Sequence, residues 1–211
     1  MITFLELVMS WSIVITNVAS IIVAILAIYG ITAWKREFRG RRRMELAEDI
    51  LTLFYKAEAG LGIMRSPLSS SSEGKSRKQG DDETEMEIQA RNRAYVLIER
   101  YQLYEDTFNQ IQALRFRFMA TFGKESIKPF DDLSMIVTKL LLSAKRLAQI
   151  WSQYTLKNSS ETPHASSLSR QQSEEMLFYE NLNETDKLKG EINSFMSEIE
   201  LTCKEALSKD I

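Results

Sequence analysis

The most distinctive pattern in the chain is an uncharged, mainly hydrophobic run at positions 11–34. An α-helix rises about 1.5 Å per residue, so roughly 20 apolar residues cross a hydrocarbon core of about 30 Å. Trp11 and Trp34 stand at the two ends of the run, and indole rings favour membrane–water interfaces. The pattern therefore predicts a transmembrane helix over 11–34, with one tryptophan in each interface.

A basic juxtamembrane segment at 35–43 follows the predicted span and sets its expected orientation. It holds one acidic residue, Glu37, and six basic ones: Lys35, Arg36, Arg39, Arg41, Arg42 and Arg43. Basic residues beside a span stay on the cytoplasmic side, so we expect a single-pass protein of the inner (plasma) membrane. Residues 1–10 would form a short extracytoplasmic N-terminus. A cleaved signal peptide would instead need a basic segment before a shorter apolar core.

After the span, hydrophobic residues recur mostly at alternating intervals of three and four in four segments. This spacing places them on one stripe of a helix, which must be buried against other helices. The stripes are Ala47, Ile50, Phe54, Ala57, Leu61 and Met64; Ala94, Leu97, Tyr101, Tyr104, Phe108 and Ile111; Phe130, Leu133, Val137, Leu140, Ala144, Leu147, Trp151 and Tyr154; and Leu188, Ile192, Phe195, Ile199, Cys203 and Ala206. No segment alternates with a period of two. The predicted fold class is all-α, with the transmembrane helix continuing into an antiparallel cytoplasmic helical bundle of about four long helices over 44–211.

Two polar stretches separate these helical segments. The stretches 66–83 and 157–173 are rich in Ser and charge, with too few apolar residues to offset the entropy of ordering. We therefore expect both to be mobile connections, with a shorter helix from about 174 to 181. The Asn-Glu-Thr sequence at 183–185 is expected to cap the last helix.

Gly123 and Pro129 refine the expected helix ends, and Gly40 bears on whether the span continues into the bundle. Gly123 is expected to end the second helix, and Pro129 fits the first turn of the third, where its missing N–H has no helical acceptor. Only Gly40 interrupts the helical composition between the span and Met44. The span is therefore expected to continue directly into the first helix of the bundle.

The composition disfavours most catalytic chemistry. The chain has one histidine, His164, in a polar stretch, and one cysteine, Cys203, which we expect to be a buried small hydrophobe. A single histidine rules out a di-iron bundle, an HExxH zinc site and a conventional Ser-His-Asp triad. No glycine-rich phosphate loop occurs, and the acidic cluster at 81–87 fits a helix start better than a calcium loop. We expect no enzyme, no cofactor and no metal site.

The second helical segment alternates arginines with aromatic residues, both of which are enriched at protein contacts. Its candidate partner-binding residues are Arg91, Arg100, Tyr104, Arg115 and Arg117. The alternative is an aromatic core whose arginines extend to the surface. Arg115 falls where the stripe calls for an apolar residue, so it needs a carboxylate or several carbonyl partners if it is buried.

These observations favour a non-enzymatic membrane-anchored adaptor or scaffold that engages a protein partner at the cytoplasmic face. The alternative is a self-assembling membrane effector or channel subunit. In that case the span would self-associate through its small and polar residues Asn17, Ser20, Ala24 and Ala27. The expected partners are the lipid bilayer and either another protein or a second copy. Because the basic residues are concentrated at 35–43, the rest of the chain is mildly acidic and unsuited to nucleic acid.

Overall fold

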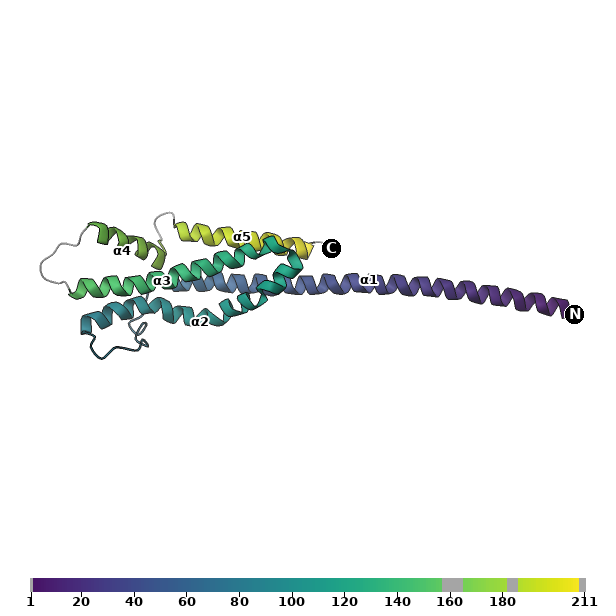
Figure 1. Cartoon of the computed structure of the whole chain (residues 1–211), viewed down its shortest axis with the longest axis horizontal. Helices are drawn as coiled ribbons and strands as arrows, with labels where there is room; N and C mark the ends of the chain where they lie inside the picture. The colour runs from purple at the N-terminus through teal and green to yellow at the C-terminus, as the bar shows by residue number, and fades with distance from the viewer. Residues whose placement is uncertain (1, 157–164, 182–185, 209–211) are drawn as a thin grey trace. The chain divides into compact units, whose positions relative to one another are not determined.

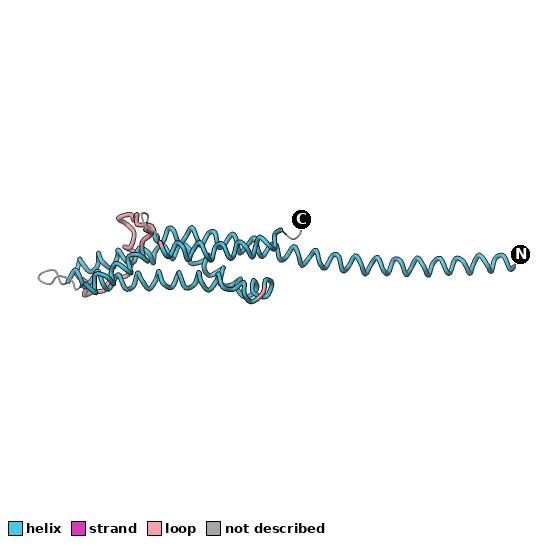
Figure 2. The backbone as a smooth tube through the Cα atoms, turned by 90° about the horizontal axis from the view of Figure 1, so that it is seen from above, coloured by secondary structure: helices cyan, strands magenta, loops and turns pink. Residues whose placement is uncertain are grey.

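The computed structural model describes residues 2–156, 165–181 and 186–208. Within these ranges the chain forms five α-helices and one 3₁₀ helix (Figure 1). They are α1 (Ile2–Arg65), α2 (Glu85–Phe122), η1 (Lys124–Ile127), α3 (Lys128–Leu156), α4 (Ala165–Phe178) and α5 (Lys187–Ser208). The described ranges contain no strand (Figure 2). The predicted all-α fold class is therefore confirmed.

The chain divides into two units, Met1–Glu45 and Leu46–Lys209, which are described separately. The first unit consists of the N-terminal part of α1. From Ile15 to Phe38 its large apolar side chains are exposed, because no other helix of the unit covers them. Among the described residues, α1 alone is long and apolar enough to cross a membrane. The same helix continues through Gly40 to Arg65, as the sequence predicts.

The second unit contains the C-terminal part of α1 together with α2 to α5, packed around one hydrophobic core. Within it α1 and α3 run in one direction, whereas α2, α4 and α5 run in the other (Figure 1). Helices α4 and α5 both contact α3. Two consecutive helices therefore lie beside α3, where the sequence predicts a short helix near 174–181 followed by the last long helix.

The four predicted stripes form this core. Every member whose side chain the structure describes is buried, apart from the half-buried Tyr101 and Tyr104. Phe54 lies at the centre, with its ring edge-on to Phe130 at 5.1 Å and to Phe195 at 6.0 Å between centroids. Edge-to-face pairs of this kind add about 0.5–1.5 kcal/mol each beyond area burial. The rings therefore tie α1 to both α3 and α5.

Cys203 lies fully buried in the same core. Burial raises the pKa of its thiol to about 11, because the apolar surroundings disfavour the thiolate. The prediction of a buried small hydrophobe is confirmed.

The ends of α2 follow local sequence signals. Thr84 begins a capping box: its hydroxyl accepts a hydrogen bond from the Glu87 N–H, and the Glu87 carboxylate accepts one from the Thr84 N–H. Glu85 and Glu87 lie in the first turn, as expected from the acidic cluster. The helix ends at Gly123, whose φ of +99° suits a residue without Cβ. The predicted end of the second helix is confirmed.

Helix α4 corrects one sequence prediction. It begins at Ala165 and not near 174, so residues 165–173 of the predicted connection 157–173 are helical. The serine-rich composition of 165–173 concealed the first part of this helix. Its later part is held to α3 by polar contacts: Arg146 Nη1 donates to Glu174 at 2.8 Å, and Trp151 Nε1 to Glu175 at 3.1 Å. Residues 157–164 and the predicted cap at 183–185 lie outside the described residues.

Candidate functional site

The predicted membrane-interface residues all lie on helix α1 within the first unit. Trp11, Trp34 and the basic residues are exposed, except for the half-buried Arg43. Trp34 stacks on Phe38 with 5.6 Å between ring centroids, and the Arg42 guanidinium lies 4.5 Å from the Phe38 ring centroid. Arg41 pairs with Glu37, one turn earlier, at 2.5 Å.

The candidate self-association residues of the span lie on one side of α1. Asn17, Ser20, Ala24 and Ala27 follow one another at intervals of three, four and three, and all four are exposed. The Ser20 hydroxyl donates to the Thr16 carbonyl at 2.8 Å, so its hydrogen bond is already made within its own helix. Close approach of a second helix here would rest on the small side chains and on the Asn17 amide.

Arg100 is not on an exposed face of α2, although the sequence suggests it as a partner-binding residue. Only 5% of it is exposed. Its guanidinium donates to the Ser66 carbonyl at 2.7 Å, the Leu68 carbonyl at 2.5 Å and the Glu73 carboxylate at 2.8 Å. It also donates to the Ile63 carbonyl at 3.1 Å, at the end of α1. This clamp joins α1, the connection 66–83 and α2.

Glu99, next to Arg100, anchors the same connection. Its carboxylate accepts hydrogen bonds from the N–H groups of Gly74 and Ser76 and from the Ser76 hydroxyl. Burial raises the pKa of Glu99, but these hydrogen bonds outweigh it and hold the pKa below its ordinary value. Gly74 has a φ of +82°, and a Cβ there would lie 2.1 Å from the Asn92 carbonyl oxygen. Only glycine allows this close approach.

Arg91, a second candidate partner residue, belongs to an ion-pair network. Its guanidinium lies 2.5 Å from Glu83, which also pairs with Arg77. Arg77 in turn donates to the Asn92 side chain at 3.0 Å. The hydrogen bond from Arg77, opposed by partial burial and supported by Arg91, lowers the pKa of Glu83 to about 2. The mobility predicted for 66–83 stays a prediction. Movement of this connection would break the ion pairs and hydrogen bonds of Arg77 and Glu83.

The lowered pKa of Glu83 predicts a pH-dependent contribution to stability. A carboxyl whose folded pKa is below its ordinary value of 4.5 stabilises the fold above that value. This contribution is lost as the pH falls through about 2. Glu83→Gln should therefore lower the melting temperature of the full-length protein in detergent at pH 7. The difference from wild type should close between pH 4.5 and about 2.

Glu85, two residues further on and exposed in the first turn of α2, provides the matched control. At pH 7, Glu85→Gln should lower the melting temperature relative to wild type by less than Glu83→Gln does. A Glu83→Gln difference that persists unchanged at pH 2 would contradict the assigned ion pairs.

The remaining α2 candidates divide between the interior and the surface. The Tyr104 ring lies against Gly60 of α1, where a Cβ would come within 2.8 Å of the ring. Arg115 is half-buried and pairs with Asp131 at 2.5 Å, which supplies the carboxylate that its position requires. Arg117 is exposed. The five candidates therefore do not form one face, and only Arg115 and Arg117 remain near the surface at the C-terminal end of α2.

A buried ion pair between Arg65 and Asp186 was not anticipated from the sequence. Their side chains are 3% and 4% exposed and approach to 2.8 Å. Arg65 also donates to the carbonyls of Met176, Leu177 and Tyr179 at the end of α4. Asp186 caps α5 by accepting from the Leu188 and Lys189 N–H groups. An aspartate just before a helical stripe signals a cap, but no local pattern signals the distant arginine.

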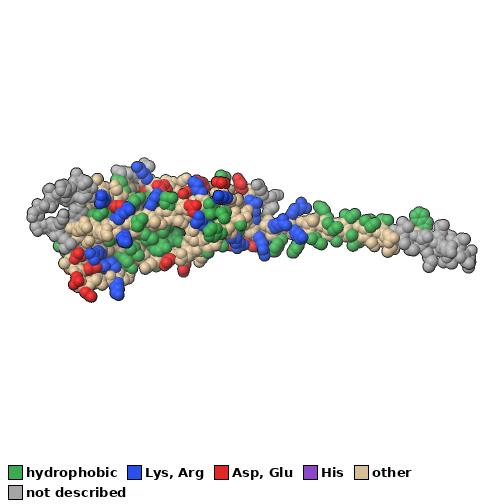
Figure 3. Space-filling model, viewed as in Figure 1, with side chains coloured by type: hydrophobic (Ala, Val, Ile, Leu, Met, Phe, Trp, Pro, Cys, Tyr) green, Lys and Arg blue, Asp and Glu red, His purple; other side chains and the backbone are tan. Residues whose placement is uncertain are grey.

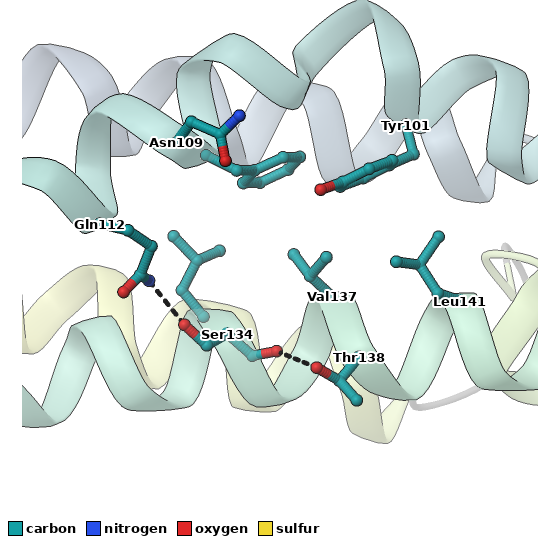
Figure 4. Close-up of a pocket in the computed structure, with 9 residues that line it drawn as sticks. Tyr101, Asn109, Gln112, Ser134, Val137, Thr138 and Leu141 are labelled. Carbon is teal, nitrogen blue, oxygen red and sulfur yellow. Dashed lines mark hydrogen bonds between the residues drawn. The ribbon is translucent and has the colours of Figure 1, made fainter.

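A groove of about 240 Å³ lies between α2 and α3 (Figure 4). Its floor includes Tyr101 and Phe108, whose rings stack with 5.6 Å between centroids, and Leu141 from α3. On its rim the Gln112 amide donates to the Ser134 hydroxyl at 2.6 Å. Ligand pockets commonly occupy about 300–1,000 Å³, so this groove suits side chains from a docked helix better than a whole small molecule.

Hydrophobic side chains gather over α2 and α3 on the face shown in Figure 3. Phe116 follows Gln112 by one helical turn and is 66% exposed. Met135 and Leu142 are also exposed and flank Thr138, another groove residue, on α3. Exposed apolar patches with polar rims mark contact sites on soluble domains. We call the groove with Phe116, Met135 and Leu142 the α2–α3 face.

Among the described residues, no group of three or more His, Cys, Asp or Glu side chains could hold a metal ion. Comparison of the chain with protein-family models, with curated proteins and with solved structures returns no match. The function proposed below therefore rests on the sequence and on the geometry of the chain.

Proposed function

We propose that the chain is a non-enzymatic, single-pass membrane adaptor. Residues 11–34 span the bilayer, residues 1–10 lie outside, and the helical unit lies in the cytoplasm, where it binds a protein partner. The exposed apolar side chains of α1, followed by the basic segment 35–43, support the span and its orientation.

The α2–α3 face is the observation that carries the adaptor proposal. It combines an apolar floor, a polar rim and the protruding ring of Phe116. An amphipathic helix can lay its apolar face in such a groove, with its anchors spaced three and four residues apart. Arg117 follows Phe116 along α2 and is exposed, so it can pair with a carboxylate of the partner. The proposed occupant is thus an amphipathic helix of another protein with acidic residues beside its apolar stripe.

Site-specific photo-cross-linking of the full-length protein in cells tests this proposal. A photoreactive residue at 116 or 135 should link one defined foreign protein. The matched control positions are Leu103, which is 76% exposed on α2, and Leu201 on α5. Cross-links of equal yield to the same protein from all four positions would contradict a specific α2–α3 face.

Self-assembly is the alternative function. It is supported by the exposed side of α1 that contains Asn17, Ser20, Ala24 and Ala27. The same experiment separates the two, because self-assembly predicts links only between copies of this chain. Ion flux through liposomes that contain the purified protein would then show whether such an assembly conducts.

A further inference from the structure

The basic residues of the first unit are unevenly distributed around helix α1. At about 100° per residue, five of them fall within an arc of about 120°: Lys35, Arg36, Arg39, Arg42 and the half-buried Arg43. Glu37 and Arg41 lie on the opposite side and neutralise each other at 2.5 Å. We call the four exposed residues of the arc (Lys35, Arg36, Arg39 and Arg42) the cationic face. The one acidic residue of 35–43 is therefore held away from it.

The cationic face keeps its charge. All four side chains are exposed, and within the described part of the chain no ion pair joins any of them to a carboxylate. The Arg42 guanidinium lies 4.5 Å from the Phe38 ring centroid, and this contact leaves its charge in place. Four cations without carboxylate partners on one side of a helix form a surface suited to anionic groups.

The position of this face along α1 identifies the anion. If Trp34 lies at the membrane interface, Lys35, Arg36 and Arg39 follow within about 8 Å along the axis. The headgroup layer on each side of a bilayer is about 5–8 Å thick. These three side chains therefore lie at the depth of the lipid phosphates. Arg42 lies about one turn further out and can extend its side chain back towards the membrane.

We infer that the cationic face binds the phosphate groups of anionic phospholipids in the cytoplasmic leaflet, and that it selects these lipids over zwitterionic ones. A positively charged face is attracted to the negative surface of such a leaflet. Guanidinium groups also form paired hydrogen bonds with phosphate oxygens. This inference rests on the proposed membrane span and adds a lipid class to it.

The test uses full-length protein reconstituted in vesicles that contain phosphatidylcholine and phosphatidylglycerol. Spin-labelled forms of each lipid report the fraction that is motionally restricted at the protein surface. We expect the labelled phosphatidylglycerol to associate on the order of threefold more strongly than labelled phosphatidylcholine. Excess inorganic phosphate at constant ionic strength should not abolish this preference, because the bound phosphate belongs to a lipid.

Two variants test whether the lipid preference depends on the cationic face or on the charged pair on the opposite side of the helix. Arg36→Gln/Arg39→Gln/Arg42→Gln should bring the preference close to one. Glu37→Gln/Arg41→Gln removes the neutral pair on the opposite side of the same helix and should keep the wild-type preference. Since the bilayer is symmetric, a change of orientation in the triple variant does not affect the measurement.

Three results would overturn the inference. Equal association of both lipids with the wild-type protein would do so, as would an undiminished preference in the triple variant. The absence of any restricted lipid would overturn the membrane span as well, which distinguishes the failure of the two proposals. A preference abolished by inorganic phosphate would assign the face to free phosphate in place of lipid.

Discussion

Arg65→Met is expected to destabilise the helical unit by about 3–5 kcal/mol, the range for breaking a buried ion pair by removing one partner. The methionine leaves the Asp186 carboxylate, 4% exposed, without its cation. The three carbonyls at the end of α4 also lose their donors. Chemical unfolding of the full-length protein in detergent, followed by near-ultraviolet circular dichroism, measures the loss.

The titration of Asp186 gives a second measure of the same variant. Burial raises the pKa of Asp186, but the Arg65 hydrogen bond and two backbone N–H groups outweigh it and lower the pKa below its ordinary value. Without Arg65, burial is opposed only by the backbone hydrogen bonds. The pKa of Asp186 should therefore rise. Its ionised form then contributes less to stability, so the difference in stability between the variant and wild type should narrow as the pH falls.

Asp186→Asn is the matched partner variant. Asparagine caps a helix about as well as aspartate, so the start of α5 is kept while the charge is removed. The double variant Arg65→Met/Asp186→Asn should be more stable than Arg65→Met alone, because no uncompensated carboxylate remains buried. If the double variant shows the full sum of both single losses, the two residues are not coupled and the assigned role of the pair is wrong.

The hydrophobic stripes were predictable because their signal is local. Residues such as Phe54 and Phe195 recur with the period of an α-helix, and burying such a stripe is the main source of helix stability in water. The pattern did not specify which helix each stripe would face. Contacts such as the 5.1 Å approach of Phe54 to Phe130 depend on the packing of the whole unit.

The arginines of α2 could not be sorted by sequence alone. Arg100 and Arg117 both lie near aromatic residues, yet one is buried in a clamp and the other is exposed. The partners of Arg100 come from the end of α1 and from 66–83, a stretch whose composition indicates only polarity. For Arg115, its place on an apolar stripe indicated that it needs a carboxylate or several carbonyl partners, and Asp131 supplies the carboxylate.

Arg100→Leu is expected to release the connection 66–83 from α2. It removes the donor to the Ile63, Ser66 and Leu68 carbonyls and leaves Glu73 unpaired. Because Glu73 keeps partial exposure, we expect a destabilisation of about 2–3 kcal/mol, below the range for a fully buried pair. The Arg100 hydrogen bond is also the main cause of the lowered pKa of Glu73, so that pKa should rise towards its ordinary value. Hydrogen exchange of the backbone at 66–76 should accelerate at least about tenfold, which corresponds to 1.4 kcal/mol of local opening.

Arg117→Leu provides the control for Arg100→Leu, because Arg117 is exposed on the same helix. It should change stability by less than about 0.5 kcal/mol and leave exchange at 66–76 unaltered, yet weaken cross-linking from position 116. The opposite pattern, with accelerated exchange in Arg117→Leu and unchanged exchange in Arg100→Leu, would show that the clamp does not hold the connection.

The Arg100 clamp also explains why deleting 66–83 is a poor test of partner binding. Such a deletion strips buried Arg100 of Glu73 and of two carbonyl acceptors, so it would destabilise the unit whether or not a partner binds there.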